Sequence, residues 1–178
     1  MNIIETERLL IKQIRPKDIN PLHKIYNEPD NMQFISSGKS NWTQQELIDK
    51  YKEINKNYDL GFGIFALEIK ETSEIIGEAG LFNSFGNLSK LELGYIIDKK
   101  YWLKGFGKET CLGLMNYAFK ELNIETLVAR MYSKNLSSIA LSEKCGMVKV
   151  DSGLADNGAE CITYEIYKKH ESPIHAHK

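Results

Sequence analysis

The chain has 178 residues, of which 42% are hydrophobic and 26% are charged, and its formal net charge is −1. The length suits one domain with a single core, and the composition is that of an ordinary globular protein. The balanced charge argues against a nucleic-acid-binding module, which needs a basic face. No apolar run approaches the roughly 20 residues that span a bilayer, and the amino terminus is too acidic for a signal peptide. We therefore expect a cytoplasmic protein with no membrane or nucleic-acid partner.

The three cysteines, Cys111, Cys145 and Cys161, are odd in number and far apart in the sequence. This spacing favours free thiols in a reducing compartment over a disulfide framework. No cysteine stands in a recognisable nucleophile motif, so we expect all three to pack as small apolar side chains. The pair His175 and His177 offers too few ligands for a metal site. No metal is therefore predicted.

Apolar periodicity and turn residues divide the chain into strands and helices. Thr43 and Glu46 form a capping box, and Asn135 is a candidate cap for a helix that Gly146 ends. In chain order, the predicted elements are a strand over Leu9–Ile14, a helix over Ile19–Tyr26, a helix from Thr43 to Tyr58, strands over Phe62–Ile69, Ile75–Phe82 and Leu91–Ile97, a helix over Lys108–Leu122, a strand over Thr126–Tyr132, a helix from Asn135 to Lys144, and strands over Met147–Gly153 and Cys161–Tyr167.

The order of these elements indicates the fold class. The hairpin over residues 62–82 argues against an all-parallel sheet, while the strands and helices alternate between residues 91 and 150. We expect an α/β (α+β) domain with a mixed, mostly antiparallel central sheet of about seven strands and helices on both faces. The domain is predicted over residues 1–168, and residues 169–178 are predicted to form a flexible C-terminal tail.

The stretch from Leu91 to Lys108 carries the strongest functional signal in the chain. A buried strand, a basic and aromatic loop and two glycines lead into the start of a helix. Free N–H groups at the positive end of a helix, next to lysines, suit the phosphates of a nucleotide-like cofactor. The residues that would bind phosphate there are Lys104, Gly105, Phe106, Gly107 and Lys108.

Two common glycine-loop motifs are excluded by residue identity. A dinucleotide-binding fingerprint needs a third glycine where Thr110 stands, and a Walker loop needs a glycine where Trp102 stands. A tight strand-to-helix turn without a ligand is the alternative to a phosphate site.

Several short segments match, in order, the motifs of a known family. They are Thr6–Ile11 with Asp18, Ile76–Leu81, Glu92–Asp98, the loop Trp102–Gly107, Asn135–Ser138 and Glu143–Met147. Together they resemble the GNAT acetyltransferase superfamily, in the branch of the RimJ- and RimL-type ribosomal-protein N-terminal acetyltransferases. The resemblance runs from Ile3 to Tyr167. Trp102 and Leu103 depart from the usual acetyl-CoA loop.

The resemblance implies an acetyl-CoA-dependent N-acetyltransferase that transfers an acetyl group to a primary amine by direct attack, without a covalent intermediate. It also implies that the strand over 91–97 separates from the strand over 126–132, and that the pantetheine arm of the cofactor lies between them. The residues implied in cofactor binding are the backbone of Tyr95, Ile96 and Ile97 at the carbonyl oxygen, the phosphate-binding residues named above, and Asn135 at the pantetheine amides.

The implied reaction needs a base and an acid. Because amines are mostly protonated near neutral pH, a group must remove the amine proton. Glu92 is the first candidate base and Glu78 the second, with an ordered water as another route; each could instead be an ordinary solvent-facing strand residue. Ser138 is the candidate acid for the leaving thiolate. Ser142, which stands where many family members have tyrosine, and water are the alternatives.

The resemblance places the acceptor opposite the cofactor, between residues 26–42 and 151–161. Asn31–Ile35 and Trp42 supply aromatic and polar surface there. The acceptor is predicted to be a protein N-terminus or a small-molecule amine, and the protein a monomer or homodimer. The alternative function is a non-catalytic acyl-CoA-binding sensor on the same fold.

Overall fold

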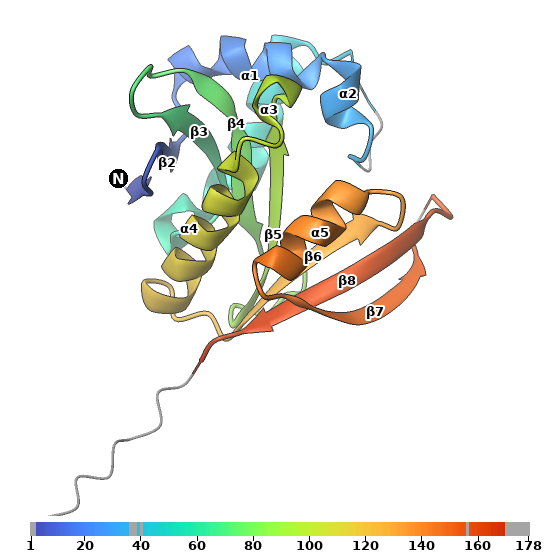
Figure 1. The fold of residues 1–178 in the computed structure, drawn as a ribbon. Coiled ribbons are helices and arrows are strands. Elements are labelled where there is room, and N and C mark those ends of the chain that lie inside the picture. Colours follow the sequence, from blue (N-terminus) through green and yellow to red (C-terminus); the bar gives the residue numbers. More distant parts are fainter. Residues whose placement is uncertain (1–2, 36–38, 40, 156, 170–178) are drawn as a thin grey trace, which may run out of the picture.

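The computed structural model describes residues 3–35, 39, 41–155 and 157–169. Within these residues the chain forms an eight-stranded sheet in the order β1-β2-β3-β4-β5-β6-β8-β7, with helices on both of its faces (Figure 1). Of the predicted tail, only Lys169 lies within the described residues. No helix in this part of the chain is long and apolar enough to cross a membrane.

Most of the predicted elements are present. The strands are β1 (Ile3–Glu5), β2 (Leu9–Gln13), β3 (Ile64–Ile69), β4 (Ile75–Phe82), β5 (Lys90–Ile97), β6 (Thr126–Tyr132), β7 (Val148–Leu154) and β8 (Glu160–Tyr167). The α-helices are α1 (Ile19–Tyr26), α2 (Pro29–Met32), α3 (Gln44–Ile54), α4 (Phe106–Lys120) and α5 (Leu136–Lys144). The prediction missed β1, of three residues, and α2, of four, because such short segments show no periodicity.

Two helix boundaries differ from the prediction because backbone geometry, rather than side-chain pattern, sets them. α4 begins earlier than predicted, at Phe106, since Gly105 is its N-cap and adopts a left-handed conformation with a φ of 85°. α3 ends at Ile54, and the chain continues as a 3-10 helix over Asn55–Leu60. Tyr58 therefore packs from the 3-10 helix and not from α3.

All neighbouring strands in the described sheet are antiparallel except β5 and β6, which confirms the mixed, mostly antiparallel topology. β5 and β6 pair from Lys90–Thr126 to Glu92–Val128. Beyond these pairs, β5 stays paired with β4, and β6 with β8. A gap therefore opens between β5 and β6, and Figure 1 shows β6, β8 and β7 diverging from β5.

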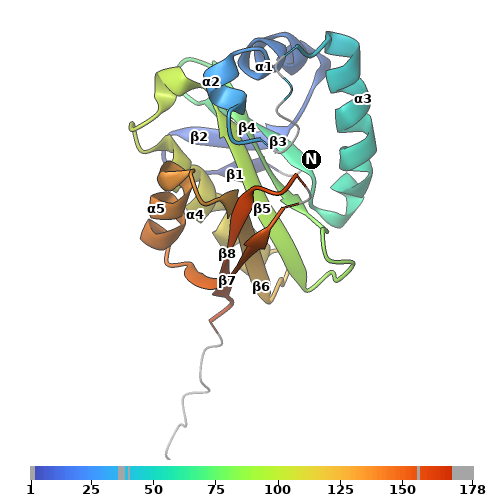
Figure 2. The ribbon, with the colours of Figure 1, turned by 90° about the vertical axis from the view of Figure 1, so that its right-hand side faces the viewer.

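Alternation along β5 divides its side chains between two hydrophobic cores. Leu91, Leu93 and Ile97 belong to the core that α4 covers, and Tyr95 packs against it. Ile96 belongs to the core formed with α1 and α3. Figure 2 shows α4 and α5 on one side of the sheet and α3 on the other. The position of a residue in β5 thus decides which side of the sheet its side chain faces.

The amino-terminal turn of the chain is tied to the first turn of α4. Thr6 Oγ1 and the Arg8 amide each donate to Glu109 Oε1 at 2.6 Å, and Arg8 Nε donates to Oε2 at 2.7 Å. Arg8 also donates to the Lys104 carbonyl at 3.0 Å and lies 4.2 Å from the centre of the Phe106 ring. These contacts hold the turn that precedes α4 against the amino-terminal strands.

Glu109 makes this attachment pH-dependent. Burial alone would raise the pKa of Glu109, but hydrogen bonds from Thr6 and Arg8 outweigh it and lower the pKa below its ordinary value of 4.5. A carboxylate with a lowered folded-state pKa stabilises the fold above its unfolded-state pKa. That contribution is lost as pH falls through the folded-state value.

We expect Glu109→Gln to reduce the free energy of unfolding at neutral pH, and its difference from the wild type to close as pH falls below 4.5. Urea unfolding of both proteins across this range measures the difference. Glu121→Gln, beyond the last turn of α4, is the matched control and should show no such trend. A Glu109→Gln difference that stays constant on acidification would contradict the prediction.

Candidate functional site

Two adjoining cavities lie where β5 and β6 separate. The larger, of about 890 Å³, opens on the α1 and α3 side of the sheet, and the smaller, of about 140 Å³, lies between β5, β6 and the helices α4 and α5. The residues that line both cavities are Phe34, Ile35, Gly94, Tyr95, Arg130 and Met131. Because they share these walls, a molecule in one cavity comes close to a molecule in the other.

The turn that precedes α4 leaves backbone donors free at the positive end of the helix. Gly105 is the N-cap and has no side chain that could cap the helix. The N–H groups of Phe106, Gly107 and Lys108 belong to the first turn, where no carbonyl of the helix precedes them. Lys104 and Lys108 are exposed beside them. The five predicted phosphate-binding residues therefore lie together in a setting that suits a pyrophosphate.

Two aromatic side chains set the position of this turn. Trp102 Nε1 donates to the Ile97 carbonyl at 2.7 Å, which ties the turn to the end of β5. Phe106 is buried and packs edge-on against Tyr101, with ring centres 5.7 Å apart. Leu103, which departs from the loop motif, is exposed and takes the left-handed conformation that glycine favours, with a φ of 59°.

The β4–β5 ladder decides which backbone groups of β5 face the gap. The Asp98 N–H donates to the Ile76 carbonyl at 2.8 Å. Because backbone groups alternate along an antiparallel strand, the Ile96 N–H also faces β4, whereas those of Tyr95 and Ile97 face the gap. Of the three residues expected to bind the carbonyl oxygen, Tyr95 and Ile97 are therefore the ones with suitably directed N–H groups.

Glu92, the first candidate base, is the last β5 residue that pairs with β6, and it lines the larger cavity. Its oxygens accept from Arg130 of β6, at 3.0 Å from Nε and 2.7 Å from Nη2. Arg130 also lies 5.5 Å from the centre of the Phe85 ring. Arg130 is not among the site residues predicted from the sequence. Val128 pairs with Glu92, and the even spacing of Arg130 from Val128 places it on the same side of the sheet as Glu92.

Glu78, the second candidate base, is buried in β4 and also lines the larger cavity. Its oxygens accept from the hydroxyls of Tyr26 and Tyr51, and Lys50 Nζ lies 3.1 Å from Oε1. Burial, and then the charge of Glu78, raise the pKa of both tyrosines, so their hydroxyls stay protonated as donors. Donors from two helices therefore engage both Glu78 oxygens, whereas both Glu92 oxygens are engaged by a single side chain, that of Arg130.

Asn135 and Ser138, at the start of α5, line the smaller cavity. Asn135 caps the helix as predicted, because its Oδ1 accepts from the Ser138 N–H at 3.2 Å. Ser138 Oγ lies 3.0 Å from the hydroxyl of Tyr95, which projects from β5. Ser142 Oγ instead faces Met131 Sδ at 3.9 Å. Of the two serines, Ser138 has an oxygen partner within the cavity.

The cysteines are free, as predicted. Cys111 and Cys145 are buried and line the smaller cavity, while Cys161 lines the larger one. A hydrogen bond between the first two thiols raises the pKa of Cys111 and lowers that of Cys145. Within the described residues, no cluster of His, Cys, Asp and Glu could hold a metal ion. His175 and His177 lie outside those residues.

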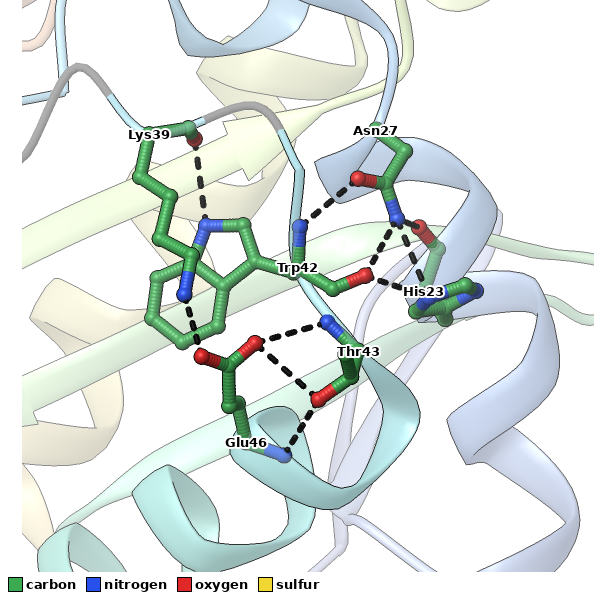
Figure 3. Close-up of polar contacts among 6 residues, drawn as sticks. All are labelled: His23, Asn27, Lys39, Trp42, Thr43 and Glu46. Atoms are coloured by element: carbon green, nitrogen blue, oxygen red, sulfur yellow. Dashed lines mark hydrogen bonds and ion pairs between the residues drawn. The ribbon is translucent and has the colours of Figure 1, made fainter.

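Figure 3 shows how the segment before α3 is attached to α1. The Trp42 N–H donates to Asn27 Oδ1 at 2.8 Å, and the Trp42 carbonyl lies 3.0 Å from Asn27 Nδ2 and 2.7 Å from His23 Nε2. Thr43 and Glu46 form the predicted capping box directly after it. Trp42 lines neither cavity, and its backbone contacts with Asn27 and His23 attach the start of α3 to α1.

The other predicted acceptor segments contribute unequally. Phe34 and Ile35 line both cavities. Asn31 is instead buried, where its amide donates to the Ile25 carbonyl and accepts from the Lys99 N–H. From the last hairpin, the larger cavity is lined by Asp151, Gly153, Leu154, Ala155, Asn157, Cys161 and Thr163. The wall of the larger cavity thus includes the segment that follows α2 and the β7–β8 hairpin.

The chain is similar to proteins named as acetyltransferases over most of its length. The uncharacterized N-acetyltransferase YnaD of Bacillus subtilis is 26% identical over 144 residues, which is 81% of each chain. A structure of RimL, a ribosomal L7/L12 alpha-N-protein acetyltransferase in complex with coenzyme A, has a TM-score of 0.82 and 14% identity, covering 93% of this chain and 98% of that one. The spermidine N-acetyltransferase of Vibrio cholerae, in complex with CoA and spermine, has a TM-score of 0.78 and 19% identity, covering 90% and 96%.

At these identities the two solved structures establish a shared fold and no more. The sequence also matches a family model, described as an acetyltransferase (GNAT) domain, over residues 8–148. That span is most of the chain and contains both the turn before α4 and the start of α5. The protein therefore belongs to the GNAT family and is an N-acetyltransferase.

Proposed function

We propose that this protein transfers the acetyl group of acetyl-CoA to a primary amine by direct attack, without a covalent enzyme intermediate. The observation that carries this proposal is the meeting of two cavities where β5 and β6 separate. A thioester that enters the gap from the α4 side and an amine that enters from the α1 and α3 side would meet there. GNAT enzymes use acetyl-CoA, and the RimL structure holds CoA.

The first turn of α4 would hold the pyrophosphate of the donor. The N–H groups of Phe106, Gly107 and Lys108 offer hydrogen bonds, and the side chains of Lys104 and Lys108 add positive charge. Gly105 supports this function because its left-handed conformation turns the chain into the helix without a side chain over the donors.

The donor's arm would lie in the smaller cavity. Acetyl-CoA, when bound, supplies the activated acetyl group and the sulfur leaving group. Asn135 would contact the pantetheine amides, and the N–H groups of Tyr95 and Ile97 would stabilise negative charge on the carbonyl oxygen. Ser138 would supply a proton to the sulfur as it leaves.

The amine must reach the thioester in its neutral form. Free amino groups have pKa values of about 8 to 10.4, so most carry a proton near neutral pH. Glu92 would accept that proton, directly or through water, because it stands at the start of the gap and lines the amine's cavity. Arg130, whose side chain is 46% exposed, would orient the carboxylate.

The acceptor is proposed to be an amine on a protein N-terminus or on a small molecule such as a polyamine. RimL and the spermidine N-acetyltransferase, which share this fold, are named for those two kinds of acceptor. The larger cavity is lined by the carboxylates of Glu78, Glu92 and Asp151 and by the cationic side chains of Lys50 and Arg130. Because Lys50 pairs with Glu78 and Arg130 with Glu92, Asp151 supplies the excess negative charge that would favour a cationic acceptor. Its volume of about 890 Å³ accommodates a peptide end or a small amine.

The alternative of a non-catalytic acyl-CoA-binding sensor on the same fold conflicts with the assignment of this chain as an N-acetyltransferase. Two features of the site are those expected of such a sensor: Ser142 stands where many family members have tyrosine, and Arg130 engages both oxygens of Glu92. Such a protein would bind CoA as tightly as an enzyme but would release no thiol with any amine.

The turn before α4 is tested by CoA binding. We expect the double variant Lys104→Ala/Lys108→Ala to bind CoA more weakly, with a dissociation constant about tenfold higher than that of the wild type at low salt. The difference should be smaller at high salt, because salt screens exposed charges. Isothermal calorimetry measures the constant. Lys120→Ala, at the other end of the same helix, is the control and should bind CoA like the wild type. If the folded wild type gave no heat of binding with millimolar CoA, acetyl-CoA would be excluded as the donor.

Catalysis is tested by release of free CoA thiol from acetyl-CoA with a panel of acceptors. The panel comprises spermidine, a short peptide with a free amino terminus and the same peptide with that terminus blocked. We expect release with one of the free amines, none with the blocked peptide, and a kcat about 10² lower in Glu92→Gln because a general base contributes at least this much. Glu165→Gln, on β8 outside both cavities, is the matched control. CoA binding without release on any amine would favour the sensor.

A further inference from the structure

The hydroxyl of Tyr95 lies where the proposed reaction releases its sulfur. Tyr95 projects from β5 toward α5, its hydroxyl lies 3.0 Å from Ser138 Oγ, and both residues line the smaller cavity. We propose that Tyr95 is a positioning residue, which donates to Ser138 Oγ and so directs the Ser138 proton toward the departing sulfur. This inference rests on the proposed function.

The direction of the hydrogen bond follows from the chemistry of the two hydroxyls. A phenol, with an ordinary pKa of about 10, is a stronger donor and a weaker acceptor than the hydroxyl of serine. Burial raises the pKa of Tyr95 further, so the phenol keeps its proton near neutral pH. Ser138 Oγ therefore accepts from Tyr95, and the hydrogen of Ser138 is left to point elsewhere in the cavity.

Other polar side chains around the smaller cavity have partners or proposed roles elsewhere. Asn135 Oδ1 accepts from the Ser138 N–H, and the Asn135 amide nitrogen is proposed to contact the pantetheine amides. Arg130 is bound to a carboxylate, Ser142 faces the thioether of Met131, and the Cys111 and Cys145 thiols are hydrogen-bonded to each other. A sulfur in this cavity would meet the Ser138 hydroxyl as its donor. Since each hydrogen bond in a chain polarises the next, donation from Tyr95 also strengthens Ser138 as a donor.

The transfer step balances without a proton from Tyr95. The amine nitrogen forms a bond to the acetyl carbon, and the carbon–sulfur bond breaks with its electron pair going to sulfur. The sulfur takes the proton of Ser138, which regains one from water. Glu92 passes the proton of the ammonium form to solvent before the attack, and passes the second nitrogen proton to solvent as the amide forms. The hydroxyl of Tyr95 touches no reacting atom and acts only through Ser138, separately from the Tyr95 N–H at the carbonyl oxygen.

Tyr95→Phe removes the hydroxyl and keeps the ring. With the most active amine of the panel, we expect kcat to fall about tenfold, the size of one orienting hydrogen bond, with the KM for acetyl-CoA unchanged. Ser138→Ala should be slower still, and the double variant no slower than Ser138→Ala alone, because Tyr95 acts through Ser138. Tyr164→Phe, which removes a hydroxyl that donates to Glu143 of α5 outside both cavities, is the matched control and should keep the wild-type kcat.

Each outcome decides between distinct conclusions. An unchanged kcat in Tyr95→Phe overturns the inference and leaves the proposed function intact. The same holds if Tyr95→Phe lowers kcat by the same factor in the wild type and in Ser138→Ala. A raised KM for acetyl-CoA with an unchanged kcat also overturns it, because that result indicates packing against the cofactor arm. A folded wild type that releases no thiol with any free amine overturns the proposed function, and this inference with it.

Discussion

The candidate site depends on one constraint, which is that two parallel strands pair and then separate. β5 and β6 are joined only as far as Glu92 and Val128, and each then remains bonded to its other neighbour. Backbone groups need hydrogen-bond partners, and in a continuous sheet the next strand supplies them. Beyond the separation, the N–H groups of Tyr95 and Ile97 point to the side from which β6 has diverged, and Tyr95 lines both cavities there. The same separation connects the two faces of the sheet, since both cavities share walls at this place.

Glu78 and Glu92, the two glutamates beside this opening, differ in their hydrogen-bond partners and therefore in the roles that the structure favours for them. Glu78 and Glu92 both lie on the α1 and α3 side of the sheet and both line the larger cavity. Glu78 is 4% exposed and is engaged by two tyrosines and a lysine, which makes it part of the attachment of α1 and α3. Glu92 has Arg130 as its partner, and its place at the start of the gap suits proton transfer.

Local patterns predicted most elements and the turn before α4, but they assigned some residues incompletely. The caps at Thr43 and Asn135 could be predicted because a cap and its partners lie within three residues. Gly107 is one of the residues predicted from the sequence to bind phosphate. In the structure a Cβ on Gly107 would lie 3.0 Å from Leu141 Cδ2, so its small size also allows α4 to approach α5.

The sequence by itself determined the order of the elements, the fold class and the cluster of donors and lysines at the start of α4. All of these depend on residues that are neighbours along the chain. Only the tertiary structure decided which side chains meet across the gap. Glu92 meets Arg130 over 38 residues of sequence, and Tyr95 meets Ser138 over 43. Such pairs result from strand pairing and helix packing, which bring together residues that no local pattern connects.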